Sequence, residues 1–183
     1  DTPAPSPLVS ASGNRFLRGI LIHRMLQALP SIHPEDREKA IERFLVQNTI
    51  GLTEIEKVKI AGNVKDILND TQFKRLFSVE SRAEVPLIGR VHLANGPQVI
   101  SGQIDRLVVS NGEVLAVDYK TLRFPPLREE DIPVGYMRQM AAYRALLRGI
   151  WPGRIVKCAL LWTESPSLMW LNDVHLNAFV PDP

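Results

Sequence analysis

The chain has 183 residues, of which 45% are hydrophobic, so it is large enough to bury the core of one globular domain. Its formal net charge of +2 excludes a strongly basic nucleic-acid coat, so any affinity for DNA has to come from a local patch. The single cysteine, Cys158, excludes an intrachain disulfide and a four-cysteine metal site. No apolar run is long enough to span a membrane and no secretion signal is visible, so we expect a cytoplasmic protein.

Residues 1–14 are rich in proline, serine and alanine, which predicts a linker. A helix is expected over residues 15–29, because Pro30 stops it. One stripe of this helix carries four residues at helical spacing, namely Phe16, Ile20, His23 and Leu26. A lone histidine on such a stripe is either a hydrogen-bonded core residue or a ligand, and the pattern alone leaves both open.

Two further amphipathic helices are expected over residues 34–48 and 53–69. The second begins with a capping box, in which Thr53 is followed three residues later by Glu56. Together with residues 71–77 these helices carry no evident chemistry. We therefore expect them to form a helical layer that packs on a sheet.

A series of strands follows, predicted over residues 79–87, 90–94, 99–109 and 114–121, with Asn-Gly turns at 95–96 and 111–112. Asn-Gly between apolar, β-branched runs favours a two-residue type I′ loop. With Asn111 and Gly112 as that loop, Asp105 lies directly opposite Asp118, with Cβ atoms roughly 4.5 to 5.5 Å apart. Lys120 projects from the same face as Asp118.

Two carboxylates at that separation repel each other by roughly 3 kcal/mol at an effective dielectric constant of about 20, so something should be bound between them. Hard oxygen ligands beside a lysine suit a divalent cation such as Mg²⁺ and a substrate that carries phosphate. The alternative is a solvated strand face, where acids and a lysine only keep the edge soluble. The surrounding residues favour a buried sheet, in which charges are rarely unpaired, because nearly all of them are apolar.

The rest of the chain predicts a crossover. Residues 123–133 form a proline-rich, charged loop that is long enough to be functional, and a helix is expected over residues 134–148. The strand over residues 155–162 would then return parallel to the strand of Asp118 by a right-handed connection, and residues 167–171 form a last strand. The expected fold class is α/β, with a central mixed sheet, made of an antiparallel meander plus a parallel crossover strand, flanked by helices.

Four short motifs occur in order along the chain: His23 late in the first helix, Gly-x-Ile-Asp at 102–105, Asp-Tyr-Lys-Thr at 118–121 and Gln-x-x-x-Tyr at 139–143. Together they resemble the PD-(D/E)XK nuclease superfamily, and within it the RecB-like nuclease domain. The runs IDRL, DYKT, RQMAAYRALL and LLWT are most similar to the AddA type of helicase-nuclease. The resemblance implies one nuclease domain over residues 15–183, with a helical part at 15–78 and a restriction-endonuclease-like core at 79–171. One departure is that Gln103-Ile104 precedes Asp105, where the superfamily pattern has proline.

The resemblance also implies a Mg²⁺ site, for which Mn²⁺ can substitute. Its protein ligands are expected to be Asp105, Asp118, the backbone carbonyl of Tyr119 and His23. Lys120 would orient the attacking water or help to deprotonate it, and would balance the developing negative charge.

The expected site includes further residues. Gln139 and Tyr143 are expected beside the active site, where they orient the DNA or the catalytic groups. Glu84 is either a further acidic ligand or water-positioning group, or a plain surface charge. Candidates for phosphate contacts, which are otherwise solvated surface charges, are Arg15, Arg18, Arg106, Arg123 and Arg138.

The function that the resemblance implies is a metal-dependent deoxyribonuclease within a bacterial helicase-nuclease that processes double-strand breaks for recombinational repair. The expected partners are single-stranded and duplex DNA ends, the rest of a helicase polypeptide and a partner subunit, but no membrane. The chain has no Gly-x-x-x-x-Gly-Lys-Ser/Thr loop, so ATP binding would reside elsewhere in a longer polypeptide. Two alternatives stay open: a free-standing nuclease, and an inactive nuclease fold that serves as a docking module.

Overall fold

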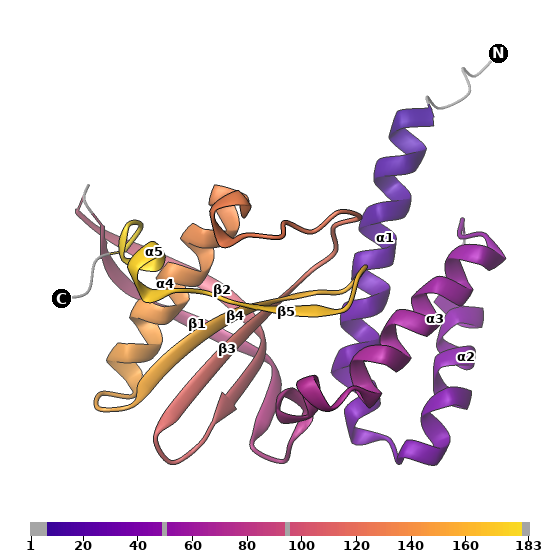
Figure 1. Cartoon of the computed structure of the whole chain (residues 1–183), viewed down its shortest axis with the longest axis horizontal. Coiled ribbons are helices and arrows are strands. Elements are labelled where there is room, and N and C mark those ends of the chain that lie inside the picture. Colours follow the sequence, from indigo (N-terminus) through magenta and orange to yellow (C-terminus); the bar gives the residue numbers. More distant parts are fainter. Residues whose placement is uncertain (1–6, 49–50, 94–95, 181–183) are drawn as a thin grey trace.

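A computed structural model describes residues 7–48, 51–93 and 96–180, with the side chains of residues 16–47, 51–92 and 96–180. A five-stranded sheet lies between two groups of helices (Figure 1). The first group covers one face of the sheet and consists of α1 (Pro7–Ala28), α2 (Arg37–Asn48) and α3 (Glu54–Asn69). The other face is covered by α4 (Val134–Ile150), with the short α5 (Asp173–Asn177) beside it.

The strands follow one another across the sheet in the order of the sequence. They are β1 (Ser81–Leu93), β2 (Gly96–Val109), β3 (Glu113–Lys120), β4 (Ile155–Trp162) and β5 (Ser167–Trp170). All neighbouring pairs are antiparallel except β3 and β4, which are parallel and are joined through α4. The predicted mixed sheet flanked by helices, a restriction-endonuclease-like arrangement, is therefore confirmed.

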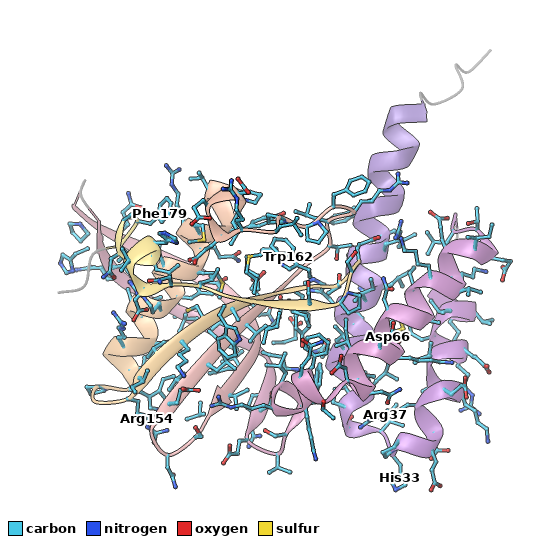
Figure 2. All side chains as sticks on the ribbon, viewed as in Figure 1. His33, Arg37, Asp66, Arg154, Trp162 and Phe179 are labelled. Carbon is cyan, nitrogen blue, oxygen red and sulfur yellow. The ribbon has the colours of Figure 1, made fainter. Side chains whose placement is uncertain are left out.

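The core has two parts, one on each face of the sheet. Residues of β3 alternate between them: Ala116 packs towards α4, whereas Leu115 and Val117 pack towards the helical layer of α1, α2 and α3. Trp162, almost fully buried, lies between the sheet and α4 (Figure 2). Because the helical layer and the strands share one core, α1 is packed against the sheet.

The helical layer begins earlier than the sequence predicts. Helix α1 starts at Pro7, so the predicted linker is wrong for residues 7–14, and residues 1–6 lie outside the described residues. Proline is compatible with the first turn of a helix, and residues 8–14 contain only one glycine, Gly13, that would weaken the helix. The predicted capping box of α3 is confirmed, because the Thr53 hydroxyl accepts from the Glu56 N–H while the Glu56 carboxylate accepts from the Thr53 N–H.

Strand β1 is longer than predicted, because the two predicted strands form one continuous strand through Gly89. A Cβ atom at Gly89 would lie 2.6 Å from Cδ2 of Leu146 on α4. This glycine is therefore a point of close packing and not a turn. Of the predicted turn at 95–96, only Gly96 is described, with a φ of 104° and a pairing to Leu93.

Short 3₁₀ turns connect several elements. They are η1 (Leu29–Ser31), η2 (Pro34–Asp36), η3 (Thr71–Phe77) and η4 (Glu129–Asp131). Two of them, η1 and η3, add buried residues to the core. No helix within the described ranges is both long and apolar enough to cross a membrane.

Candidate active site

The β2–β3 hairpin has the register that the sequence predicts. The Ser110 N–H donates to the Glu113 carbonyl at 2.9 Å across the two-residue loop, and regular pairing continues to Arg106 opposite Val117. Regular pairing ends there, and one further step of the same register corresponds to Asp105 opposite Asp118. The hairpin thus delivers both acids to the same level of the sheet, as its turn chemistry predicts.

The ladder of hydrogen bonds changes at Asp105. Bonded pairs alternate along an antiparallel ladder, so the next bond after Arg106–Val117 would join the Tyr119 N–H to the Ile104 carbonyl. Instead, the Tyr119 N–H donates to Oδ2 of Asp105 at 2.6 Å. A side chain has replaced a backbone acceptor here, which fixes the Asp105 carboxylate between the two strands.

Strand β1 is irregular at the same level, where Glu84 occupies the position opposite Asp105. Glu84 has a φ of 52°, the single positive value at a non-glycine residue among the described residues. This left-handed conformation costs an L-residue about 1–2 kcal/mol. Gln103 helps to hold it, because its side-chain Nε2 donates to the Glu84 carbonyl at 3.2 Å. Backbone strain of this kind concentrates at functional sites.

The side-chain alternation of β2 slips by one residue at this point. Ile104 and Leu107 lie three residues apart, yet both pack in the core towards α4. Asp105 falls within the slip and is turned towards the histidine of α1: Nδ1 of His23 lies 3.2 Å from Oδ1 of Asp105. One ligand atom each from His23, Glu84 and Asp105 lies within 4.8 Å of the others. Imidazole and carboxylates at this spacing suit a divalent cation.

The electrostatics of the acids reflect crowding. Burial, followed by repulsion from Asp105, raises the pKa of Asp118 to about 6, although the Lys120 ammonium opposes the shift. Burial and the charge of Asp105 also raise the pKa of Glu84. For His23, burial lowers the pKa, but hydrogen bonding to Asp105 and the nearby acids outweigh it and raise the pKa overall. The cluster of acids therefore favours the binding of a cation.

Lys120 is held by residues from both β3 and α4. Its Nζ lies 2.6 Å from Oδ2 of Asp118, donates to Oε1 of Gln139 at 2.9 Å, and lies 4.3 Å from the centre of the Tyr136 ring. Gln139 in turn donates to the Tyr143 hydroxyl at 3.2 Å. The four predicted residues Asp118, Lys120, Gln139 and Tyr143 are thus brought together in one chain of contacts.

Tyr143 closes this chain against β2. Its hydroxyl donates to the Gln103 carbonyl and accepts from the Gln103 N–H, both at 3.2 Å. A Cβ atom at Gly102 would lie 2.2 Å from the hydroxyl oxygen, so only glycine admits this close approach. The Gly-x-Ile-Asp motif therefore contains both an acid of the site and the space for the tyrosine that supports it.

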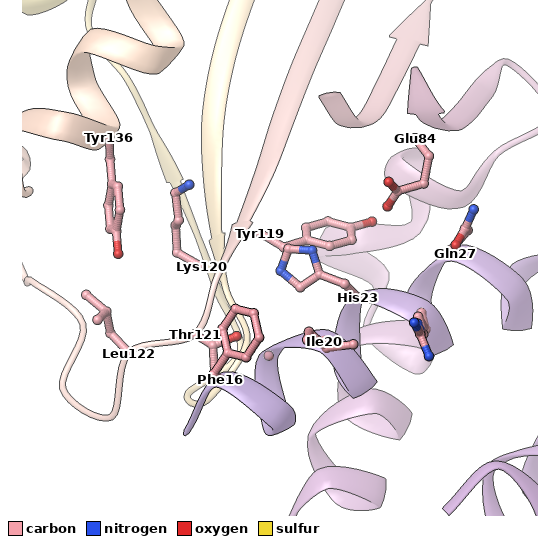
Figure 3. Close-up of a pocket in the computed structure, with 12 residues that line it drawn as sticks. Phe16, Ile20, His23, Gln27, Glu84, Tyr119, Lys120, Thr121, Leu122 and Tyr136 are labelled. Atoms are coloured by element: carbon pink, nitrogen blue, oxygen red, sulfur yellow. The ribbon is translucent and has the colours of Figure 1, made fainter. Parts of the chain in front are cut away.

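A cavity of about 790 Å³ opens beside these groups (Figure 3). Its walls come from α1, β1, the end of β3 and the start of α4. Polar or aromatic groups on these walls are His23, Arg24, Gln27, Glu84, Tyr119, Lys120 and Tyr136. Tyr119 lies edge-on to His23, with ring centres 5.3 Å apart, while the predicted role of its carbonyl as a ligand stays a prediction.

The arginines predicted to contact phosphate lie in different environments. Arg106 is wrong as a DNA contact, because it is buried against the helical layer, where its guanidinium donates to the Leu26 carbonyl and the Tyr119 hydroxyl. Arg18 forms a 2.5 Å ion pair with the buried Glu164 instead of standing free. Arg123 is exposed, with its guanidinium 5.4 Å from the ring centre of Phe124, and Arg138 is also exposed. The side chain of Arg15 lies outside the described residues.

Sequence reasoning missed two residues of the cavity on α1, Arg24 and Gln27. The helical spacing that singled out His23 also singles out Gln27, four residues later on the same face. Sequence reasoning also gave no indication of Glu164, which pairs with Arg18 and whose Oε2 lies 3.7 Å from Nζ of Lys59. No local pattern predicts that partnership, because the residues are far apart in sequence.

Comparisons with known proteins identify the family of the chain. The model of the PD-(D/E)XK nuclease superfamily matches residues 4–166. A search of curated proteins gives no match. Among solved structures, SSO0001 has a TM-score of 0.37 at 13% identity, covering 92% of this chain and 83% of that one. Protein VC1899 from Vibrio cholerae has a TM-score of 0.35 at 13% identity, covering 88% of this chain and 48% of that one.

Proposed function

Because the chain belongs to the PD-(D/E)XK nuclease superfamily, we propose that it is a deoxyribonuclease that hydrolyses DNA phosphodiester bonds with Mg²⁺, for which Mn²⁺ substitutes. One observation carries the proposal. Lys120 lines the same cavity as His23 and Glu84, and its ammonium lies 2.6 Å from the Asp118 carboxylate. An acid, a histidine and a lysine in one cavity, with a second acid paired to the lysine, are groups that metal-assisted phosphodiester hydrolysis needs.

The donor set fits a hard divalent cation. Two carboxylates from adjacent strands, Glu84 and Asp105, gather beside His23, while Asp118 pairs with Lys120. Burial and repulsion from Asp105 raise the pKa of Glu84 and of Asp118. Oxygen donors with one imidazole match what Mg²⁺ and Mn²⁺ accept. When bound, the cation would neutralise phosphate charge and acidify the attacking water.

The remaining work falls to residues of the chain itself. Hydrolysis forms a bond between phosphorus and the oxygen of water and breaks the bond to a sugar oxygen. Lys120 donates hydrogen bonds to the attacking water and stabilises the negative charge that grows on the phosphate. Gln139 holds the Lys120 ammonium by a hydrogen bond of 2.9 Å, and Tyr143 holds Gln139, so the lysine keeps its position during the reaction.

The experiment that tests the proposal incubates the purified chain with linear and circular DNA, single-stranded or duplex, in Mg²⁺ or in chelator. Cleavage is expected only with the metal, and Lys120→Ala should lower its rate by about 10³-fold. Lys74→Ala, which removes an exposed lysine on η3, is the matched control and should cut at the wild-type rate. Equal cleavage by wild type and Lys120→Ala, or cleavage in chelator, would disprove the proposal.

The biological setting is a finer part of the proposal. The runs IDRL, DYKT, RQMAAYRALL and LLWT support an AddA-type context, in which residues 15–183 act as one nuclease domain of a helicase-nuclease that processes double-strand breaks. Its partners would be DNA ends, the helicase part of the polypeptide and a second subunit, in the bacterial cytoplasm. The alternative of an inactive docking module is less well supported, because such modules lose an acid or the lysine. This chain keeps Asp105, Asp118 and Lys120.

A further inference from the structure

The phenylalanines of this chain are distributed unevenly between core and surface. Of six, Phe44, Phe73, Phe77 and Phe179 are buried or half-buried. The other two, Phe16 and Phe124, are 73% and 81% exposed. Exposing a large aromatic ring is unfavourable unless something covers it. Of the two exposed rings, Phe16 also lines the active-site cavity.

Phe16 stands at the rim of the active-site cavity. It lines the wall formed by α1, seven residues before His23, which corresponds to about 10 Å along the helix axis (Figure 3). Helical spacing puts Phe16 on the same stripe as His23 and Leu26, yet only the C-terminal end of that stripe is covered by the core. The ring is thus left facing the cavity and solvent.

The opposite side of this rim is formed by the segment that follows β3. Leu122 lines the cavity there, and a Cβ atom at Gly19 would lie 3.4 Å from Oγ1 of Thr121, so α1 and this segment meet. Two residues further on, the exposed Phe124 carries the Arg123 guanidinium 5.4 Å from its ring centre. Arg123 and Phe124 thus follow directly on the part of this segment that lines the cavity.

We propose that Phe16 stacks on an unpaired base of the substrate, with Phe124 and Arg123 extending the contact, so that the site selects single-stranded DNA. This inference rests on the proposed nuclease function. A duplex presents sugars and phosphates on its outside and hides the faces of its bases, so an apolar ring beside the scissile phosphate gains nothing from it. A single strand exposes the faces of its bases, and each stacked base contributes to binding regardless of its identity.

The test measures binding of the purified chain to single-stranded oligodeoxythymidine, and to a strand of equal length whose sugar-phosphate backbone carries no bases. Ca²⁺ replaces Mg²⁺ so that the strands stay intact. Phe16→Ala should weaken binding to oligodeoxythymidine about tenfold and leave binding to the abasic strand unchanged. Phe16→Trp should bind at least as tightly as wild type, because it keeps the ring.

Val58→Ala is the matched control, since Val58 is 71% exposed on α3 and does not line the cavity. It should bind both strands as wild type does. The inference is overturned if Phe16→Ala loses no affinity, if it loses the same factor on both strands, or if Val58→Ala loses as much. If the wild-type chain neither binds nor cuts DNA, the proposed function is overturned as well. If the wild-type chain cuts DNA and Phe16→Ala binds it as tightly as the wild type, only the stacking contact is overturned.

Discussion

The two halves of the β2–β3 hairpin differ in structure although they share two strands. Near the turn, residues 106–109 pair regularly with residues 114–117, and nearly all of these side chains are buried and apolar. Beyond Arg106, an acid replaces a backbone acceptor, the alternation slips, and the neighbouring strand has a strained Glu84. The regular half supplies stability and sets the positions of the acids, while the irregular half holds the groups that react.

The largest effect is expected in the irregular half. Asp105→Asn keeps the shape of the side chain and an acceptor for the Tyr119 N–H, but removes the charge that attracts a cation. We expect cleavage to fall by about 10³-fold, since the charge stabilisation supplied by a metal amounts to several kcal/mol. Urea unfolding in chelator should give a free energy of unfolding equal to the wild type or higher, because a repulsive charge is gone.

A large truncation in the regular half should have the opposite profile. Leu115 is 1% exposed in the core towards the helical layer, so Leu115→Ala should lower the free energy of unfolding by about 3 kcal/mol. Below its unfolding temperature the variant should keep the wild-type kcat for DNA cleavage. The division between the halves fails if Leu115→Ala abolishes cleavage while folded, or if Asp105→Asn unfolds the chain.

Gly102 is expected to affect both stability and catalysis. Gly102→Ala forces the Tyr143 hydroxyl to move, which disturbs the contact from Gln139 to Lys120. We expect a loss of about 1–3 kcal/mol in the free energy of unfolding and a lower kcat. Gly62→Ala on α3, where an added Cβ meets nothing within 4 Å, is the control and should stabilise by up to about 1 kcal/mol. Identical behaviour of the two variants would show that the contact of Gly102 with Tyr143 has no consequence.

The smallest effect concerns the strained backbone. Glu84→Gly should raise the free energy of unfolding in chelator by about 1 kcal/mol, because glycine adopts a positive φ without steric cost. It should also weaken metal binding, since a carboxylate is lost. Ala83→Gly, at the preceding residue of β1, should instead lower stability by about 0.5–1 kcal/mol. A loss of stability in both variants would argue against strain at Glu84.

Local sequence rules predicted the regular half well. The Asn111-Gly112 turn gave the pairing of β2 with β3, and this pairing was enough to bring Asp105 and Asp118 to one level. The predicted break between the strands 79–87 and 90–94 was wrong, because Gly89 admits Leu146 of a neighbouring helix and does not interrupt the strand. The long α1 was also missed, since a proline-rich start looks like a linker.

The irregular half was harder to predict, because it depends on contacts between distant segments. The strained φ of Glu84, the slip at Asp105 and the pairing of Arg18 with Glu164 arise from tertiary packing and leave no local pattern. The burial of Arg106 could have been inferred from Val108, because residues two apart on a regular strand share a face, and Val108 is an apolar residue of the core towards the helical layer.

Binding of Mn²⁺, followed by titration calorimetry, tests most directly whether the irregular half is a metal site. The wild-type chain should bind the ion, and Asp105→Asn and His23→Ala should each weaken binding by at least about tenfold, in line with the loss of a ligand. Asp131→Asn, which removes an exposed acid paired with Arg128, should bind as the wild type does. A chain that binds no Mn²⁺, or binds it equally after both substitutions, would contradict the account.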